Sequence, residues 1–93
     1  MHAYLKGFVY ILKSDKTGKY YIGSSDNPER RLETQHNIGF VRSTRSGIPW
    51  KLVFKQEYIN LLMARKIEYK LKKLKSRIII EKIIDDNFCK LVG

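Results

Sequence analysis

Two short apolar segments near the start of the chain are separated by a run of turn-forming residues. Residues 8–13 and 19–23 are rich in β-branched and aromatic side chains, which favour strands. Between them, residues 14–18 combine Ser, Asp, Thr and Gly, a composition typical of tight turns. The pattern predicts a β-hairpin.

The register of this hairpin brings two tyrosines together. If Lys13 and Gly18 close the loop, Tyr10 lies directly opposite Tyr21, and a slip of one residue makes their contact diagonal. In both cases we expect the two rings to lie within reach of each other on one face of the sheet.

A helix start follows the second predicted strand. Asp26 or Asn27 can cap this helix, Pro28 suits its first position, and we expect it to end before Gly39. The segment 39–50 is polar and predicts a loop of turns.

Residues 51–58 alternate in a way that predicts a third strand. One set of side chains is Leu52, Phe54 and Gln56, and the other is Val53, Lys55 and Glu57. We expect the two sets to point to opposite faces of the sheet.

An apolar stripe at helical spacing follows the third predicted strand. The stripe consists of Leu61, Ala64, Ile67, Leu71 and Leu74. Asn60 can cap this helix, and Ser76 can cap a third helix. The three isoleucines at 78–80 are also compatible with a short strand. We expect Phe88 and Leu91 to fold back onto the core.

These elements predict an α/β (α+β) fold, in which a small three-stranded antiparallel sheet is flanked by helices. We expect one domain over residues 5–86 and a C-terminal tail over residues 87–93. A chain of 93 residues has room for one modest core and for no accessory domain.

The charge balance suggests a class of partner. The formal net charge is +10 at pH 7, which favours a polyanion such as nucleic acid, although a basic surface without such a partner is the alternative. The single cysteine can form no internal disulfide, and no apolar run is long enough for a membrane span. We therefore expect a cytoplasmic protein with no membrane contact.

Several segments, taken in order, resemble the GIY-YIG nuclease family and its small single-domain members. Phe8-Val9-Tyr10 and Tyr21-Ile22-Gly23 stand where the two halves of the family's motif fall. The other matching segments are 27–32 with His36, 43–44 with 49–53, and 64–68. The resemblance covers residues 7–84. It implies a metal-dependent endonuclease that hydrolyses phosphodiester bonds of DNA, with a role in DNA repair or recombination.

The resemblance also implies roles for individual residues. Tyr10 and Tyr21 are both candidates for the general base, and Arg31 would clamp the scissile phosphate. His36 would contact the phosphate or the base tyrosine. Glu68 would bind Mg²⁺ or Mn²⁺, with no small-molecule cofactor required.

Glu68 is also conspicuous apart from the resemblance. It is one of only two acidic residues between Leu61 and Lys82, and it lies at the edge of the apolar stripe. A carboxylate in that position is expected to be paired or bound to a metal. An ion pair with Lys72, four residues further along the helix, is the alternative to a metal ligand.

A further group of polar side chains is expected to contact the DNA backbone without reading its sequence. These residues are Arg30, Arg42, Ser43, Thr44, Arg45 and Lys51. The sequence contains no cluster of zinc ligands and no Gly-rich nucleotide loop.

The chain departs from the family pattern at three positions. Phe8 replaces the first glycine and Val9 replaces isoleucine, while Ser24 stands where some repair nucleases have lysine. The alternative is therefore a nucleic-acid-binding module of the same fold without catalysis. A basic interaction protein of a larger complex is a third reading.

Overall fold

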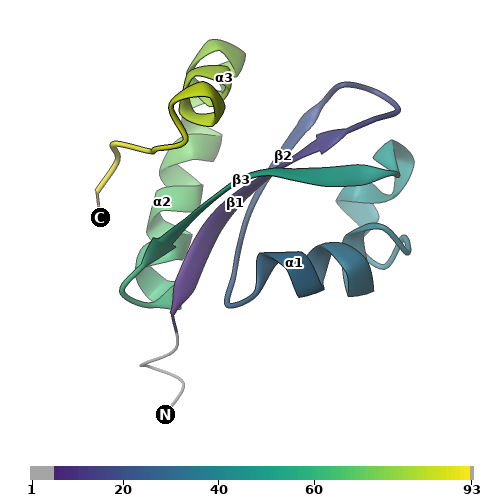
Figure 1. The fold of residues 1–93 in the computed structure, drawn as a ribbon, viewed down its shortest axis with the longest axis horizontal. Coiled ribbons are helices and arrows are strands. Elements are labelled where there is room, and N and C mark those ends of the chain that lie inside the picture. Colours follow the sequence, from purple (N-terminus) through teal and green to yellow (C-terminus); the bar gives the residue numbers. More distant parts are fainter. Residues whose placement is uncertain (1–5, 93) are drawn as a thin grey trace.

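A three-stranded antiparallel sheet separates two layers of helices (Figure 1). The structure, a computed structural model, describes residues 6–92. The main elements are β1 (Gly7–Ser14), β2 (Tyr20–Ser25), α1 (Pro28–Arg31), β3 (Trp50–Tyr58), α2 (Leu61–Leu74) and α3 (Arg77–Asp86). Between α1 and β3 lie a short π-helix, η2 (Leu32–His36), and a 3-10 helix, η3 (Arg42–Gly47). The predicted fold class is confirmed.

The strand order is β2-β1-β3, so β1 is buried in the centre. Alternate β1 side chains enter two separate apolar clusters, because successive residues of a strand point to opposite faces. Val9 and Ile11 pack with α2 and α3, while Tyr10 and Leu12 pack with Trp50 and the segment after α1. All four of these β1 side chains are 0% exposed.

The hairpin closes one residue later on each strand than predicted. Ser14 N–H donates to the Lys19 carbonyl at 2.9 Å, and the Ser14 hydroxyl accepts from the backbone amides inside the turn. Tyr10 therefore lies opposite Gly23 rather than Tyr21, and the directly opposed tyrosine pair was wrong. A shift of two in register preserves the faces, so Tyr10 and Tyr21 still share one side.

A β-bulge in β3 overturns part of the predicted alternation. Ile11 pairs with Phe54 but Leu12 pairs with Leu52, so Val53 is the additional residue. Leu52 then packs in the Tyr10 cluster, while Val53 and Phe54 pack in the cluster beneath α2. The prediction that Leu52 and Phe54 share a face was wrong because the bulge reverses the alternation between them.

The helix starts follow the predicted capping residues. The side chains of Asn27, Asn60 and Ser76 each accept a hydrogen bond from a backbone amide in the first turn of α1, α2 and α3. Residues 78–80 are helical, which removes the ambiguity left by their β-branched side chains. Within residues 6–92, no helix combines the length and apolar character needed to cross a bilayer.

The segment after α3 returns to the core through Cys89, not through Phe88. Gln56 exchanges two side-chain hydrogen bonds with the Cys89 backbone, at 2.9 and 3.0 Å, and Cys89 is 2% exposed. Leu91 packs against the same cluster, as expected, whereas Phe88 is 56% exposed and does not. The domain boundary at residue 86 stays a prediction, and its start at residue 5 lies outside the described residues.

Candidate active site at the edge of β2

The two motif tyrosines lie diagonally across the β1–β2 pair. Their ring centroids are 6.4 Å apart, and the planes are tilted by 43°. Gly23, directly opposite Tyr10, leaves room for this ring, since a Cβ on Gly23 would lie 2.5 Å from the Tyr10 hydroxyl. The glycine of the second motif segment is thus required by the close approach of Tyr10.

Tyr10 begins a buried chain of hydrogen bonds. Its hydroxyl lies 2.8 Å from Nε2 of His36, and Nδ1 of His36 lies 2.9 Å from the hydroxyl of Thr44. The Thr44 hydroxyl donates to the Val41 carbonyl at 3.3 Å, so it accepts from His36 Nδ1–H. His36 Nε2 is then the acceptor, and the Tyr10 hydroxyl donates to it.

Burial and the nearby charge of Arg31 keep the side chains of this hydrogen-bond network neutral. Burial, and secondarily the charge of Arg31, lower the pKa of His36 to about 4, so the imidazole is uncharged at neutral pH. Burial raises the pKa of Tyr10 well above its ordinary value, Arg31 opposes that change, and Tyr21 and Glu68 reinforce it. Arg31, Tyr21 and Glu68 therefore all lie within electrostatic range of the Tyr10 hydroxyl.

Tyr21 occupies a more open position than Tyr10. It lies on the edge strand β2 and is half-buried, whereas Tyr10 is 0% exposed. Its ring centroid is 5.0 Å from that of His36 and 6.3 Å from that of Trp50. The result is a cluster of rings in which only Tyr21 reaches the surface at the strand edge.

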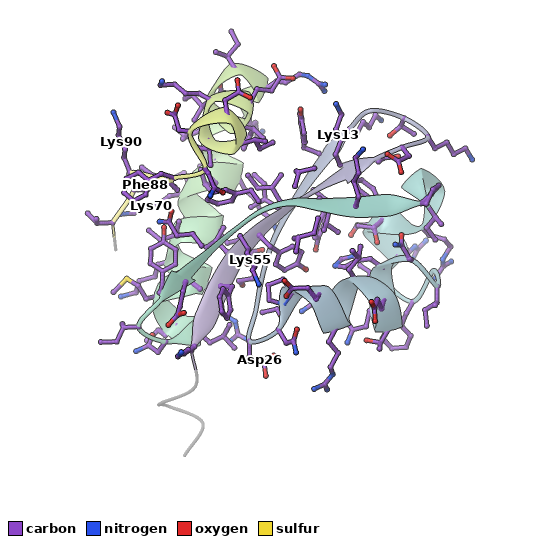
Figure 2. All side chains as sticks on the ribbon, viewed as in Figure 1. Lys13, Asp26, Lys55, Lys70, Phe88 and Lys90 are labelled. Atoms are coloured by element: carbon purple, nitrogen blue, oxygen red, sulfur yellow. The ribbon has the colours of Figure 1, made fainter. Side chains whose placement is uncertain are left out.

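Arg31 approaches the cluster from the last residue of α1. The Asn27 cap and Pro28 fix the start of this helix, which sets the direction in which Arg31 leaves it. Its Nε atom is buried and has no hydrogen-bond partner within residues 6–92. Arg31 also lines a small polar hollow of about 110 Å³ beside the β2–α1 turn, where Asp26 projects outward (Figure 2).

Glu68 reaches the same strand edge from α2, on the other side of the sheet. Its Oε1 accepts from the Ser24 hydroxyl on β2, and its Oε2 accepts from Lys72 Nζ at 2.6 Å. Lys72 Nζ also lies 5.6 Å from the centroid of the Tyr21 ring. Because β2 is an edge strand, side chains from both faces of the sheet meet around it.

The prediction that Thr44 contacts DNA was wrong. It is 0% exposed, its hydroxyl accepts from His36, and its carbonyl accepts from the Trp50 indole at 2.6 Å. A buried side chain cannot touch a phosphate on the surface. Thr44 instead supports His36, a contact that sequence spacing could not reveal.

The remaining predicted DNA contacts are exposed but scattered. Arg42, Ser43 and Arg45 lie on η3, where Arg45 Nε donates to the Gly39 carbonyl at 3.0 Å. Arg30 is exposed beside Arg31 on α1. Lys51 forms an ion pair with Asp15 at 3.4 Å. It lies opposite Lys13 in the sheet, so its side chain is on the face away from Tyr10.

Two contacts of Glu68 bear on the sequence-based interpretation. The ion pair with Lys72, which was the alternative to a metal ligand, is formed. The hydrogen bond from Ser24 does not follow from the sequence pattern, in which Ser24 only replaces the lysine of some repair nucleases. The position of Ser24 next to Gly23 on β2 was the sequence feature that could have pointed to this contact, because β2 lies beside α2, which carries Glu68.

Comparisons with known proteins identify the family of the chain. Residues 6–83 match the family described as GIY-YIG catalytic domain. The UPF0213 protein CPE1444 of Clostridium perfringens is 37% identical over 67 residues, which cover 72% of this chain and 71% of that protein. No solved structure matches the chain.

A second relative is much longer than this chain. The structure-specific endonuclease subunit slx1 of Schizosaccharomyces pombe is 45% identical over 49 residues, which cover 46% of this chain and 18% of that protein. This chain therefore corresponds to a small part of that relative. The family match extends over most of the sequence, and the chain belongs to the GIY-YIG family of endonucleases.

Proposed function

We propose that the chain hydrolyses phosphodiester bonds of DNA at the edge of β2. The observation that carries the proposal is the meeting of five polar side chains from both sides of the sheet at one strand edge. They are Tyr10, Tyr21, Arg31, His36 and Glu68. Membership of an endonuclease family supports the same chemistry.

Accessibility favours Tyr21 as the residue that activates water. The Tyr10 hydroxyl is buried and already donates to His36, so an attacking water cannot reach it in this conformation. Tyr21 lies at the open edge and, as the phenolate, would accept the proton of the water. Tyr10 and His36 then act as positioning residues that hold the Tyr21 ring.

Arg31 is the proposed phosphate clamp. Its side chain lines the polar hollow beside the β2–α1 turn, where a phosphate oxygen can approach the guanidinium. The planar guanidinium can engage two oxygens and places positive charge where negative charge develops in the transition state.

The donor set at Glu68 fits a hard divalent cation that keeps most of its waters. Among residues 6–92, no group of three or more His, Cys, Asp or Glu side chains could hold a metal, so Glu68 would be the main protein ligand. One carboxylate with water and phosphate oxygens suits Mg²⁺ or Mn²⁺. When bound, the cation would neutralise the phosphate and stabilise the leaving oxygen. Lys72 would have to release Oε2 first.

Cleavage of a panel of plasmid, branched and single-stranded DNA in Mg²⁺ or Mn²⁺ tests the proposal. We expect Glu68→Gln to reduce the cleavage rate by about 100-fold or more, and Tyr21→Phe by about 10²- to 10⁴-fold. Glu57→Gln is the matched control, because Glu57 is exposed on β3, at the opposite edge of the sheet. No cleavage by the wild type, or full cleavage by Glu68→Gln, would refute it.

Branched DNA belongs in this panel because one relative is named a structure-specific endonuclease subunit. A role in DNA repair or recombination is a part of the proposal that rests on family resemblance. A cytoplasmic location is also proposed, and it rests on the single cysteine and the absence of a long apolar run in the sequence.

A non-catalytic DNA-binding module is the second candidate. The Lys72 ion pair on Glu68 favours it, because it occupies an oxygen that a metal would need. This candidate predicts salt-sensitive DNA binding that survives both Glu68→Gln and Tyr21→Phe, without any strand cleavage.

A further inference from the structure

A groove of about 320 Å³ runs along the edge of β2 toward the junction of α2 and α3. Its lining includes Tyr20 and Tyr21 from the strand, and Lys72, Lys75, Ser76 and Arg77 from the helix junction. Tyr21 and Lys72 belong also to the candidate active site. The groove therefore begins beside Tyr21 of the candidate active site.

Three basic residues line the groove. Lys72 and Lys75 come from the end of α2, and Arg77 begins α3. Lys13 adds a further cation beside the groove, with its Nζ 5.7 Å from the centroid of the Tyr20 ring, and Figure 2 shows it projecting between the hairpin and α3. Such a line of cations complements a phosphate backbone.

The acidic side chains near the groove already accept hydrogen bonds from neighbouring residues. Glu81 accepts from the Tyr20 hydroxyl and from Arg77, each at 3.2 Å. Glu68 accepts from Ser24 and Lys72. Lys75, an exposed residue in the left-handed conformation between the two helices, therefore contributes positive charge to a partly neutralised surface.

The size and the lining of the groove favour a single strand of nucleic acid as its occupant. Its volume is near the lower end of clefts that hold a small molecule, about 300–1,000 Å³, which is enough for one or two nucleotides. Tyr20 and Tyr21 line this space together with the basic side chains. Basic grooves with aromatic side chains are typical of single-strand binding.

We propose that the groove between β2 and the α2–α3 junction binds a single-stranded nucleic-acid arm that continues from the cleaved phosphodiester. Substrates with such an arm would be bound more tightly than a continuous duplex. The position of the cleaved bond rests on the proposed function, whereas the binding of the arm is measured without cleavage.

The test is DNA binding in EDTA, followed by fluorescence anisotropy at several salt concentrations. A blunt duplex is compared with the same duplex carrying a single-stranded arm. Lys75→Gln and Arg77→Gln remove charge from the groove. Lys66→Gln is the matched control, because it removes the same charge from another face of α2, outside the groove. Thermal unfolding verifies that each variant is folded.

We expect the wild type to bind the armed duplex more tightly. For this DNA, each groove variant should reduce the slope of log K against log salt by about 0.7, the loss of one single-strand phosphate contact. Neither groove variant should change the slope for the blunt duplex. Equal wild-type affinities for the two DNAs, or equal effects of Lys75→Gln and Lys66→Gln, would overturn the inference. Absence of cleavage with this binding pattern intact would refute the proposed function alone.

Discussion

His36 is the residue whose protonation should affect the fold most clearly. Its imidazole lies between the Tyr10 hydroxyl, from which it accepts, and the Thr44 hydroxyl, to which it donates. A protonated ring would donate from both nitrogens and would lose the acceptor that Tyr10 uses. The pKa of His36 is lowered to about 4 in the folded state, against an ordinary value of 6.5.

A pKa that is lower in the folded state means that the unfolded chain binds the proton more tightly. Stability from His36 is therefore complete above pH 6.5 and is lost as the pH falls toward 4, by about 3 kcal/mol in total. Denaturant unfolding between pH 7 and pH 4 measures this loss, and His36→Gln should flatten the curve. The pKa of Glu29, lowered from 4.5 chiefly by the hydrogen bond from Lys55, adds a loss of stability at the acid end of this range that is common to the wild type and the variant. An equal slope for His36→Gln would contradict the assignment.

At the scale of the elements, local signals were sufficient for helix starts but not for strand pairing. Asn27, Asn60 and Ser76 act within one turn of chain, so each cap could be predicted from its neighbours. Register depends on atoms far apart in sequence. Ser14 shows this, since its hydroxyl donates to the Gly47 carbonyl at 2.5 Å while its turn selects the pairing of β1 with β2.

Ser14→Ala tests how much this single hydroxyl contributes. The substitution removes the acceptor for the amides of Lys16 and Thr17 and leaves the buried Gly47 carbonyl without that donor. We expect a loss of about 1–3 kcal/mol in the free energy of unfolding. Thr17→Ala is the control, because the Thr17 hydroxyl accepts one exposed hydrogen bond in the same turn and should contribute less. Similar losses for both variants would show that the turn, and not Ser14, sets the stability.

In the candidate site, too, local sequence signals predicted some residues and missed others. Tyr10, Tyr21, Arg31 and Glu68 could be selected from the sequence because they belong to motif segments in the right order. The positions of Ser24 and Thr44 could not be predicted, because each forms its hydrogen bond with a side chain of another element of the fold. Thr44 is buried because Trp50 and His36 lie against it, and no local pattern predicts that contact.

At the scale of the whole molecule, the sheet separates two apolar clusters, and its central strand contributes fully buried side chains to both. Val9 and Ile11 belong to the cluster beneath α2 and α3, while Tyr10 and Leu12 belong to the cluster with Trp50. Loss of β1 from the sheet would open both clusters at once. The candidate site needs both, because Glu68 comes from one side of the sheet and Arg31 and His36 from the other.

This arrangement predicts that the two layers unfold in a single transition. Trp50 is the only tryptophan of the chain, so its fluorescence reports on the Tyr10 cluster, whereas the helical circular dichroism comes mainly from α2 and α3 on the opposite face. Denaturant curves followed by the two signals should have the same midpoint and the same slope. Ile67→Ala, in the cluster beneath α2, should destabilise the chain by about 2–5 kcal/mol and shift both curves equally. A shift confined to the helical signal would show that the layers unfold independently, and that β1 does not couple the two halves of the site.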